Sequence, residues 1–249
     1  MRRLLLMAML SAGIACGDGT GPGGRTIRGV VSLSTVWGLP LPNDGVQVRI
    51  GTSDLVAETG DDGQWEIANV PLGTHDVHFS KPGFGPMRVP GVRMSLGTVT
   101  LEDTTYLAET PAHSAVIDSI TISTRFGPPA VLVWGKITAT PPDDAVAAAT
   151  VVYEGTSPSV GPLENTFSGA AISSAIVNGN TGERSPPDAE FVNLVLLEEV
   201  QKRHAPGSVI YYAVYASSSS CSCYVEPGSG QLIFTNVGPR GSVASIIIP

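Results

Sequence analysis

Residues 59–85 read TGDDGQWEIANVPLGTHDVHFSKPGFG, and this stretch decides the fold of the first half of the chain. Apolar and polar residues alternate at 64–67 and again at 75–80, the pattern of strands that bury one face. Gly, Pro and Asp residues separate these short runs and are typical of tight turns. A further strand is predicted at 55–59, and the turn at 60–63 is expected to join it to 64–67 as a hairpin.

The same alternation continues on both sides of this stretch. Strands are predicted over residues 27–33, 46–50, 87–94 and 98–101. Between the first two, Pro and Gly residues at 39–45 mark a turn, because proline lacks the N–H that a strand interior needs. About seven short strands at this spacing predict a β-sandwich.

Several motifs of this region resemble the carboxypeptidase regulatory-like domain, a prealbumin-like β-sandwich. The matching residues are a Thr-x-Asp-x-Gly pattern at 59–63, the aromatic Trp65, an apolar-Pro-x-Gly pattern at 70–73 and Lys-Pro-Gly-Phe at 81–84. Members of that family are non-catalytic modules of transporters, peptidases and surface proteins, and some are related to carbohydrate-binding sandwiches. The resemblance therefore implies a non-catalytic first domain over residues 26–109.

The second half of the chain also carries strand patterns. Strands are predicted over residues 114–123, 131–137, 147–153, 209–216, 231–236 and 242–248. Trp134 in an early strand and the Tyr-rich strand at 209–216 resemble a fibronectin type III-like domain. The predicted fold class is all-β, with two β-sandwich domains in tandem at 26–109 and 110–249.

One stretch of the second half departs from the β pattern. A serine followed by two prolines and an acid at 185–188 is typical of a helix start, and basic residues at 202–204 are typical of a helix end. A helix is therefore predicted over about residues 186–204. The alternative is a strand at 191–197 followed by a short helical turn, and periodicity alone does not decide between them.

The chain begins with MRRLLLMAMLSAGIAC, in which two arginines precede an apolar run that ends in small residues. This order predicts a signal peptide over residues 1–15. Residues 13–15 resemble the lipobox of bacterial lipoproteins, which implies a lipid on Cys16 and a flexible Gly-rich tether over 16–25. The membrane is then a partner, and the protein belongs to a bacterial cell envelope, at the outer membrane or cell surface. Ordinary signal peptidase cleavage, which leaves Cys16 as a free thiol, stays open.

Two further cysteines, Cys221 and Cys223, are separated by one residue in a Ser-rich stretch. A disulfide between them closes a strained small ring, yet an oxidising compartment permits it. A Zn or Cu site is an alternative, and two cysteines without a shared role are another. We predict no metal site and no cofactor, and keep the disulfide as a candidate.

Charge and motifs argue against two classes of function. The formal net charge is −8 and no basic cluster could neutralise phosphates, so no nucleic acid is expected as a partner. The sequence has no Gly-x-Ser-x-Gly and no His-Glu-x-x-His motif, so no enzyme activity is predicted. A hydrolase triad built from distant residues around His113 or His204 stays open.

The predicted function is that of a binding or scaffold lipoprotein of the cell envelope, whose ligand is a glycan or another envelope protein. Four aromatic residues are candidates for stacking on a sugar, namely Trp37, Tyr211, Tyr215 and Tyr224. The alternatives are an accessory subunit of a secreted or periplasmic hydrolase and a purely structural subunit of an envelope complex. An exposed aromatic patch beside polar side chains would favour the binding role.

Overall fold

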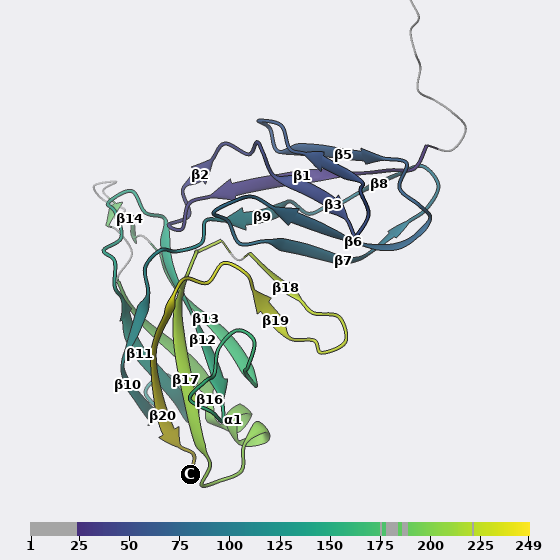
Figure 1. The fold of residues 1–249 in the computed structure, drawn as a ribbon. Coiled ribbons are helices and arrows are strands. Elements are labelled where there is room, and N and C mark those ends of the chain that lie inside the picture. The colour runs from purple at the N-terminus through teal and green to yellow at the C-terminus, as the bar shows by residue number, and fades with distance from the viewer. Residues whose placement is uncertain (1–23, 175, 178–183, 186–188, 221) are drawn as a thin grey trace, which may run out of the picture.

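The structure is a computed structural model that describes residues 24–174, 176–177, 184–185, 189–220 and 222–249. It consists of two β-sandwiches in tandem, which confirms the predicted fold class (Figure 1). The first sandwich comprises β1 to β9, and the second comprises β10 to β20 with α1. The predicted domain boundaries stay a prediction, although the buried core clusters divide between Leu107 and Ala115.

The strands of the first sandwich form two sheets. One sheet holds β1 (Thr26–Ser34), β2 (Pro40–Leu41), β5 (Gln64–Ala68), β8 (Thr98–Thr100) and β9 (Thr105–Ala108). The other has the order β4 (Val56–Glu58), β3 (Gln47–Ile50), β6 (Gly73–Ser80) and β7 (Met87–Met94). Each strand predicted for this half is present, and β2 is a short edge pairing inside the predicted turn at 39–45.

β1 is the central strand of its sheet and changes partners halfway along. Its first half pairs with β5 in antiparallel orientation as far as Val30, and with β8 in parallel orientation as far as Arg28. Its second half pairs with β9 in parallel orientation from Val31 onward. On this side, Gly29 and Val30 therefore lie between the end of one partner strand and the start of the next.

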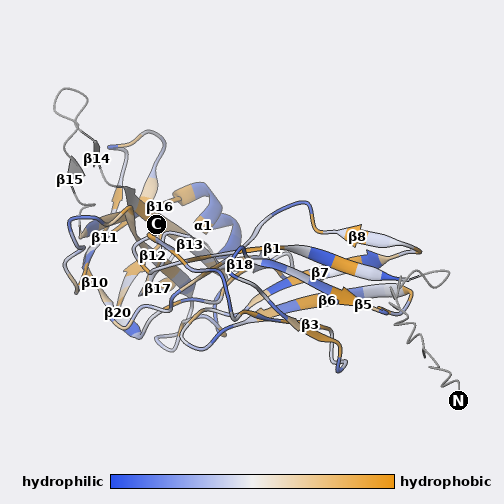
Figure 2. Cartoon of the chain, turned by 90° about the horizontal axis from the view of Figure 1, so that it is seen from above, coloured by the Kyte–Doolittle hydropathy of each residue, from blue (hydrophilic) through white to orange (hydrophobic). Residues whose placement is uncertain are grey.

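Alternation along the strands builds the core between the two sheets. In β5, Trp65 and Ile67 are buried while their neighbours are exposed, and β1 and β3 follow the same pattern. Figure 2 shows this pattern as bands of hydrophilic and hydrophobic colour along the strands. The ring of Trp65 meets the ring of Phe79 edge-on, with centroids 5.6 Å apart, which is a favourable geometry for an aromatic pair.

The predicted hairpin between residues 55–59 and 64–67 is wrong. The turn is present, since Gly63 N donates a hydrogen bond to Gly60 O. However, β4 pairs with β3, whereas β5 pairs with β1 in the opposite sheet. The composition of a turn identifies where the chain reverses, but it does not identify which strand each flanking segment will join.

The second sandwich also has two sheets. The three-stranded sheet has the order β10 (Ala115–Ser123), β11 (Ala130–Ile137) and β16 (Glu190–Leu196). The four-stranded sheet has the order β13 (Phe167–Ser174), β12 (Ala147–Gly155), β17 (Val209–Ser217) and β20 (Arg240–Ile247). Two antiparallel pairs accompany them, β14 (Ile176–Val177) with β15 (Arg184–Ser185) and β18 (Cys223–Val225) with β19 (Leu232–Phe234). The hairpin of β18 and β19 lies in the angle between the two sandwiches (Figure 1).

The helix predicted over residues 186–204 is mostly wrong. Most of the segment that precedes α1 is β16, which pairs with β11 along its whole length, and α1 is confined to Leu197–Arg203. The side chains of β16 alternate between buried and less buried, and this two-residue period against the core overrides the signals of a helix start. Residues 186–188 lie outside the described part of the chain. The alternative of a strand followed by a short helical turn is confirmed.

Candidate functional site

A groove of about 420 Å³ crosses the outer face of the first sandwich, where β5 and β8 flank the first half of β1. We call it the β1 groove. The side chains around it come from these strands and from the segment after β8, and they include Arg28, Val30, Gln64, Glu66, Thr100 and Glu102. Strand register explains the grouping, because Arg28 is the direct neighbour of Glu66 on one side and of Thr100 on the other.

The β1 groove carries three exposed charged side chains, Arg28, Glu66 and Glu102. Within the described residues, none of the three takes part in an ion pair. Arg28 Nε donates a hydrogen bond to Thr100 Oγ1 at 3.1 Å, which holds the guanidinium across the sheet. The remaining guanidinium donors and both carboxylates can therefore exchange hydrogen bonds with a polar ligand.

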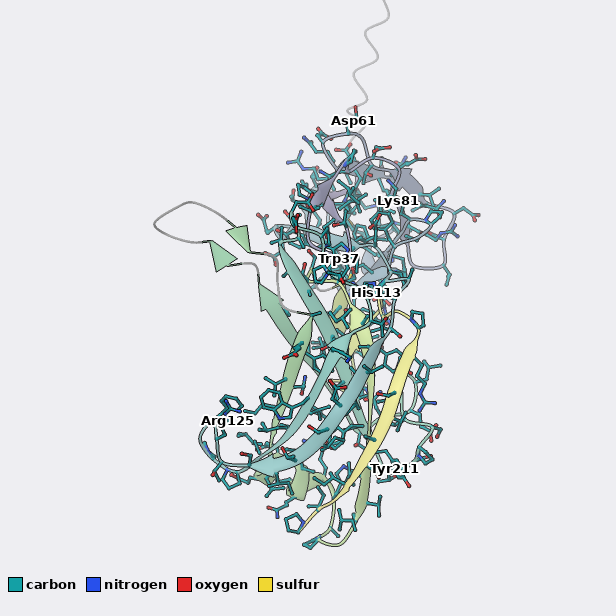
Figure 3. All side chains as sticks on the ribbon, turned by 90° about the vertical axis from the view of Figure 1, so that its left-hand side faces the viewer. Trp37, Asp61, Lys81, His113, Arg125 and Tyr211 are labelled. Carbon is teal, nitrogen blue, oxygen red and sulfur yellow. The ribbon has the colours of Figure 1, made fainter. Side chains whose placement is uncertain are left out.

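Trp37 does not lie in this groove but at the junction of the two sandwiches (Figure 3). Its ring stacks on the ring of His113, with centroids 4.9 Å apart and planes 5° apart. Its carbonyl oxygen accepts hydrogen bonds from the backbone N–H groups of Val146 and Ala147, at the start of β12. Trp37 therefore joins the two sandwiches, and His113 occupies one face of its ring. Burial lowers the pKa of His113 below its usual value.

Direct hydrogen bonds also cross the junction. Ser34 Oγ lies 3.0 Å from Ser220 Oγ, and Ala108 N donates to Ser222 Oγ at 2.9 Å. These bonds tie the paired ends of the adjacent strands β1 and β9 to the segment between β17 and β18. The two sandwiches are thus held to one another by packing and by bonds on several elements.

Arg88 on β7 forms the charged part of the junction. Its Nη2 lies 2.7 Å from Asp76 Oδ2, and its Nη1 lies 3.2 Å from both carboxylate oxygens of Glu226, which follows β18. The guanidinium also lies 5.8 Å from the ring centroid of Tyr224, within the range of a cation–π contact. A hydrogen bond from the Gly91 backbone N–H, together with the Arg88 guanidinium, holds the pKa of Asp76 below its usual value.

The other two predicted stacking residues lie on β17. Tyr215 is 7 % exposed and meets Tyr153 edge-on, with centroids 5.3 Å apart, so it has no exposed face for a sugar. Tyr211 packs beside the same cluster, toward the end of the second sandwich that lies away from the first (Figure 3). The structure therefore does not bring the four predicted aromatic residues together, and stacking of any of them on a ligand stays a prediction.

A buried charged cluster at the end of β12 was missed by sequence reasoning. Glu154 is completely buried, yet each of its carboxylate oxygens has two partners. Oε1 lies 2.9 Å from both Arg203 Nε and His204 Nε2, while Oε2 accepts from Arg203 Nη2 at 3.1 Å and from the Tyr212 hydroxyl at 3.0 Å. Burial and the adjacent carboxylate raise the pKa of Tyr212 well above its usual range, so its hydroxyl stays a donor.

This cluster does not form a hydrolase triad around His204. A triad needs the carboxylate on one ring nitrogen and the nucleophilic hydroxyl on the other. Here both Glu154 Oε1 and Thr166 Oγ1 lie next to Nε2, at 2.9 and 3.3 Å. At His113, the other histidine considered, Nε2 is buried and has no hydrogen-bond partner in the described part of the chain. The geometry fits a brace that holds the end of α1 against the four-stranded sheet.

Comparisons with known proteins give no family for the chain. No family model matches it, and no curated protein matches it. An interface mutant of a type II cohesin–X–dockerin complex from Acetivibrio cellulolyticus is similar over 34 % of this chain and 58 % of that chain, with 19 % identity and a TM-score of 0.30. The chain thus spans little more than half of that relative.

A candidate carbohydrate-binding protein from Bacteroides uniformis is similar over 89 % of this chain and 98 % of that one, with 14 % identity and a TM-score of 0.29.

A DUF3823 family protein from Bacteroides ovatus is similar over 91 % of this chain and 100 % of that one, with 11 % identity and a TM-score of 0.31. TM-scores near 0.3 are too low for any of these likenesses to carry an argument about function.

The predicted anchor and most of the predicted cysteine pair fall outside the described residues. The structure describes neither residues 1–15 and Cys16 nor Cys221. Cys223 is disulfide-bonded, and its pairing with Cys221 stays a prediction. Across the described ranges, no group of three or more His, Cys, Asp and Glu residues could hold a metal ion. In the same described ranges, no helix has both the length and the apolar composition that crossing a membrane requires.

Proposed function

We propose that this chain is a non-catalytic binding module of a bacterial cell envelope, and that its ligand, a glycan or another envelope protein, occupies the β1 groove. One observation carries the proposal. The groove is a concave surface of about 420 Å³ that holds three exposed charged side chains without ion-pair partners among the described residues. Its size falls within the range of about 300–1,000 Å³ that is common for ligand sites.

The architecture proposed around this site follows from the sequence. A lipid on Cys16 holds the protein at the outer membrane or cell surface, and the tether at 16–25 separates the first sandwich from the bilayer. The first sandwich belongs to the prealbumin-like type of the carboxypeptidase regulatory-like domains. Sheets of three and four strands in the second sandwich support its likeness to fibronectin type III domains.

The packed junction supports a scaffold role beside the binding role. The Trp37–His113 stack ties the segment before β10 to the first sandwich, and the contact of Arg88 with Glu226 ties the β18–β19 hairpin to it. The two sandwiches are therefore expected to move together, so that the β1 groove keeps a fixed orientation relative to the second sandwich.

Co-sedimentation with isolated bacterial envelopes tests the binding role. The full chain with Cys16→Ser is compared with the same chain carrying Glu66→Ala and Glu102→Ala, which remove both acids of the groove. We expect the groove variant to sediment far less. The matched control is Asp54→Ala with Asp61→Ala, which removes the same charge from exposed residues elsewhere on the first sandwich and should sediment as the parent does. Equal sedimentation of parent and groove variant contradicts the proposed site.

Intact mass tests the anchor. The unchanged chain, expressed in a lipidating bacterial host, should carry an acyl mass and pellet with membranes, and Cys16→Ser should do neither. An unmodified Cys16 with soluble release contradicts the anchor but leaves the binding role of the groove in place.

A further inference from the structure

The three-stranded sheet of the second sandwich is apolar on its outer face as well as on its inner one. Val131 and Val133 of β11, and Phe191 and Val195 of β16, belong to the buried core cluster. Successive side chains of a strand alternate between the two faces, so the residues between these point outward. The outward apolar positions are Leu132, Trp134, Val192, Leu194 and Leu196. Strands whose outer face is solvated normally alternate with polar residues, whereas β11 and β16 have the sequence of strands covered on both faces.

The strand register gathers these outward residues into one patch, which we call the β11–β16 face. It consists of three cross-strand pairs, namely Trp134 with Val192, Leu132 with Leu194 and Ala130 with Leu196. Leu194, in the middle of β16, is 43 % exposed. Single exposed apolar side chains are common, but a contiguous apolar patch on a folded domain marks a surface of interaction.

The loop at 124–129, between β10 and β11, covers the β11 half of this face. The ring of Phe126 lies 6.2 Å from the ring of Trp134, and the Arg125 guanidinium lies 5.5 and 5.8 Å from the two ring centroids. Leu132 is only 2 % exposed although it points outward. Arg125 lies toward the end of the second sandwich that is away from the first (Figure 3). The face thus has a ridge of Arg125, Phe126 and Trp134 beside a bare strip on β16.

The ridge and the strip are complementary in chemistry. Tryptophan, arginine and other aromatic residues dominate the binding energy of protein interfaces, and the ridge consists of such residues. The strip on β16 offers Val192, Leu194 and Leu196, whose side chains form no hydrogen bonds, so a glycan would leave its hydroxyl groups without partners there. A second copy of the ridge would cover the strip as the loop already covers Leu132.

The charges around the face are complementary in the same sense. The ridge half carries Arg125 at one end and Lys136 at the other, while β16 begins with Glu190 and is followed by Glu198 in α1. All four are exposed, and in the described part of the chain Arg125, Lys136 and Glu190 take part in no ion pair. Asp118, an exposed acid of β10, lies one strand further from β16.

We propose that the β11–β16 face is the interface of a homodimer, with the twofold axis parallel to the strands and between β11 and β16. This symmetry places the ridge of each copy on the strip of the other. It also brings Arg125 of one copy toward Glu198 of the other, and Lys136 toward Glu190. The interface lies on the second sandwich, so each dimer carries two β1 grooves, and the inference does not depend on what the grooves bind.

Sedimentation velocity of the Cys16→Ser chain over a wide range of protein concentration tests the dimer. We expect a monomer–dimer equilibrium. Leu194→Asp buries an unpaired carboxylate in the interface and should raise the dissociation constant by about tenfold or more. The matched control is Val209→Asp on β17, whose parent side chain is also 43 % exposed and lies in the other sheet, and it should dimerise as the parent does. Circular dichroism checks folding, and Phe126→Ser replaces Leu194→Asp if that variant does not fold.

A mixing experiment tests the symmetry. Lys136→Glu alone and Glu190→Lys alone each place like charges across both equivalent contacts, and each should weaken the dimer by about fivefold. A mixture of these two variants pairs opposite charges in both contacts. The mixture should therefore dimerise more strongly than either variant does by itself.

Three results would overturn the inference. The first is a parent chain that stays monomeric at every concentration, and if Leu194→Asp then reduces its co-sedimentation with envelopes, the face belongs to another envelope protein. The second is a dimer that Leu194→Asp leaves unchanged, because such a dimer forms through another surface. The third is a mixture of the charge variants that dimerises no better than the variants alone, which excludes the twofold arrangement. None of the three affects the test of the β1 groove.

Discussion

Replacing Glu154 by Gln keeps the shape of a completely buried side chain but removes its charge. The amide places an N–H group where an oxygen now accepts from Arg203 or from Tyr212, so donor faces donor. Breaking a buried ion pair by removing one partner costs about 3–5 kcal/mol. The Arg203 side chain is 23 % exposed and can recover some hydration, so we expect a loss of about 3 kcal/mol, at the lower end of that range.

Urea unfolding of the full chain with Cys16→Ser measures this loss. The midpoint should fall with little change in slope, and the thermal midpoint should fall by about 6–12 °C, given about 2–4 °C per kcal/mol for a protein of this size. The control is Glu198→Gln on α1, whose side chain is 78 % exposed and should contribute little. A loss below about 1 kcal/mol at Glu154 would refute the argument that the cluster braces the sandwich.

A double-mutant cycle separates the ion pair from general damage. Arg203→Met alone should also be costly, because it leaves the Glu154 carboxylate buried with fewer donors. Added to Glu154→Gln, it should cost much less than it does alone. Losses that simply add would show that the two side chains do not act as a pair.

The remaining predictions concern the junction. Gly85→Ala would place a Cβ 2.8 Å from the backbone N of Asn236, so the thermal midpoint should fall by the equivalent of about 1–3 kcal/mol. The control Gly24→Ala has no atom near the new Cβ and should leave the midpoint unchanged, and equal midpoints for the two variants would contradict the close packing at Gly85. The pKa of Asp76 is lowered in the folded chain, so the stability that its carboxylate contributes is present above about pH 4 and is lost as the pH falls further. Asp76→Asn should reduce the fall in the free energy of unfolding below about pH 4, and an unchanged fall would argue against the Asp76–Arg88 ion pair. Arg88→Gln should loosen the junction and raise the rate at which a protease cleaves there. The difference in rate between the variant and the parent should be larger at low salt than at high salt, and a difference that does not depend on salt would count against a charged contact.

The alternating strands were predictable from sequence because their period is set by local residues. β1, β3, β5 and β17 are found where alternation or β-branched residues indicated them. Pairing was less predictable, since the turn at 60–63 is correct but joins strands of opposite sheets. The segment before α1 fits both a helical and a strand period, and only its register against β11 decides between them.

The candidate site was not predictable, because the residues that make it are distant in the sequence. Arg28, Glu66 and Thr100 become neighbours only through the pairing of three strands. The four candidate stacking residues do not lie together for the same reason, since Trp37 stacks on His113 at the junction and Tyr215 is buried in the second sandwich. A signal for the Glu154 cluster was present, namely an acid inside an apolar strand, but its partner Arg203 lies 49 residues away.

The change of partners along β1 also sets the order in which the first sandwich can fold. β1 comes first in this sandwich, yet two of its partners, β8 and β9, are about 70 residues further along the chain, and such non-local parallel pairs form slowly. When synthesis has reached only β7, the edge of β1 that later pairs with β8 and β9 is open, and an open strand edge can pair with a second copy of the chain. Aggregation during synthesis or refolding should therefore decline once the chain reaches the end of β9.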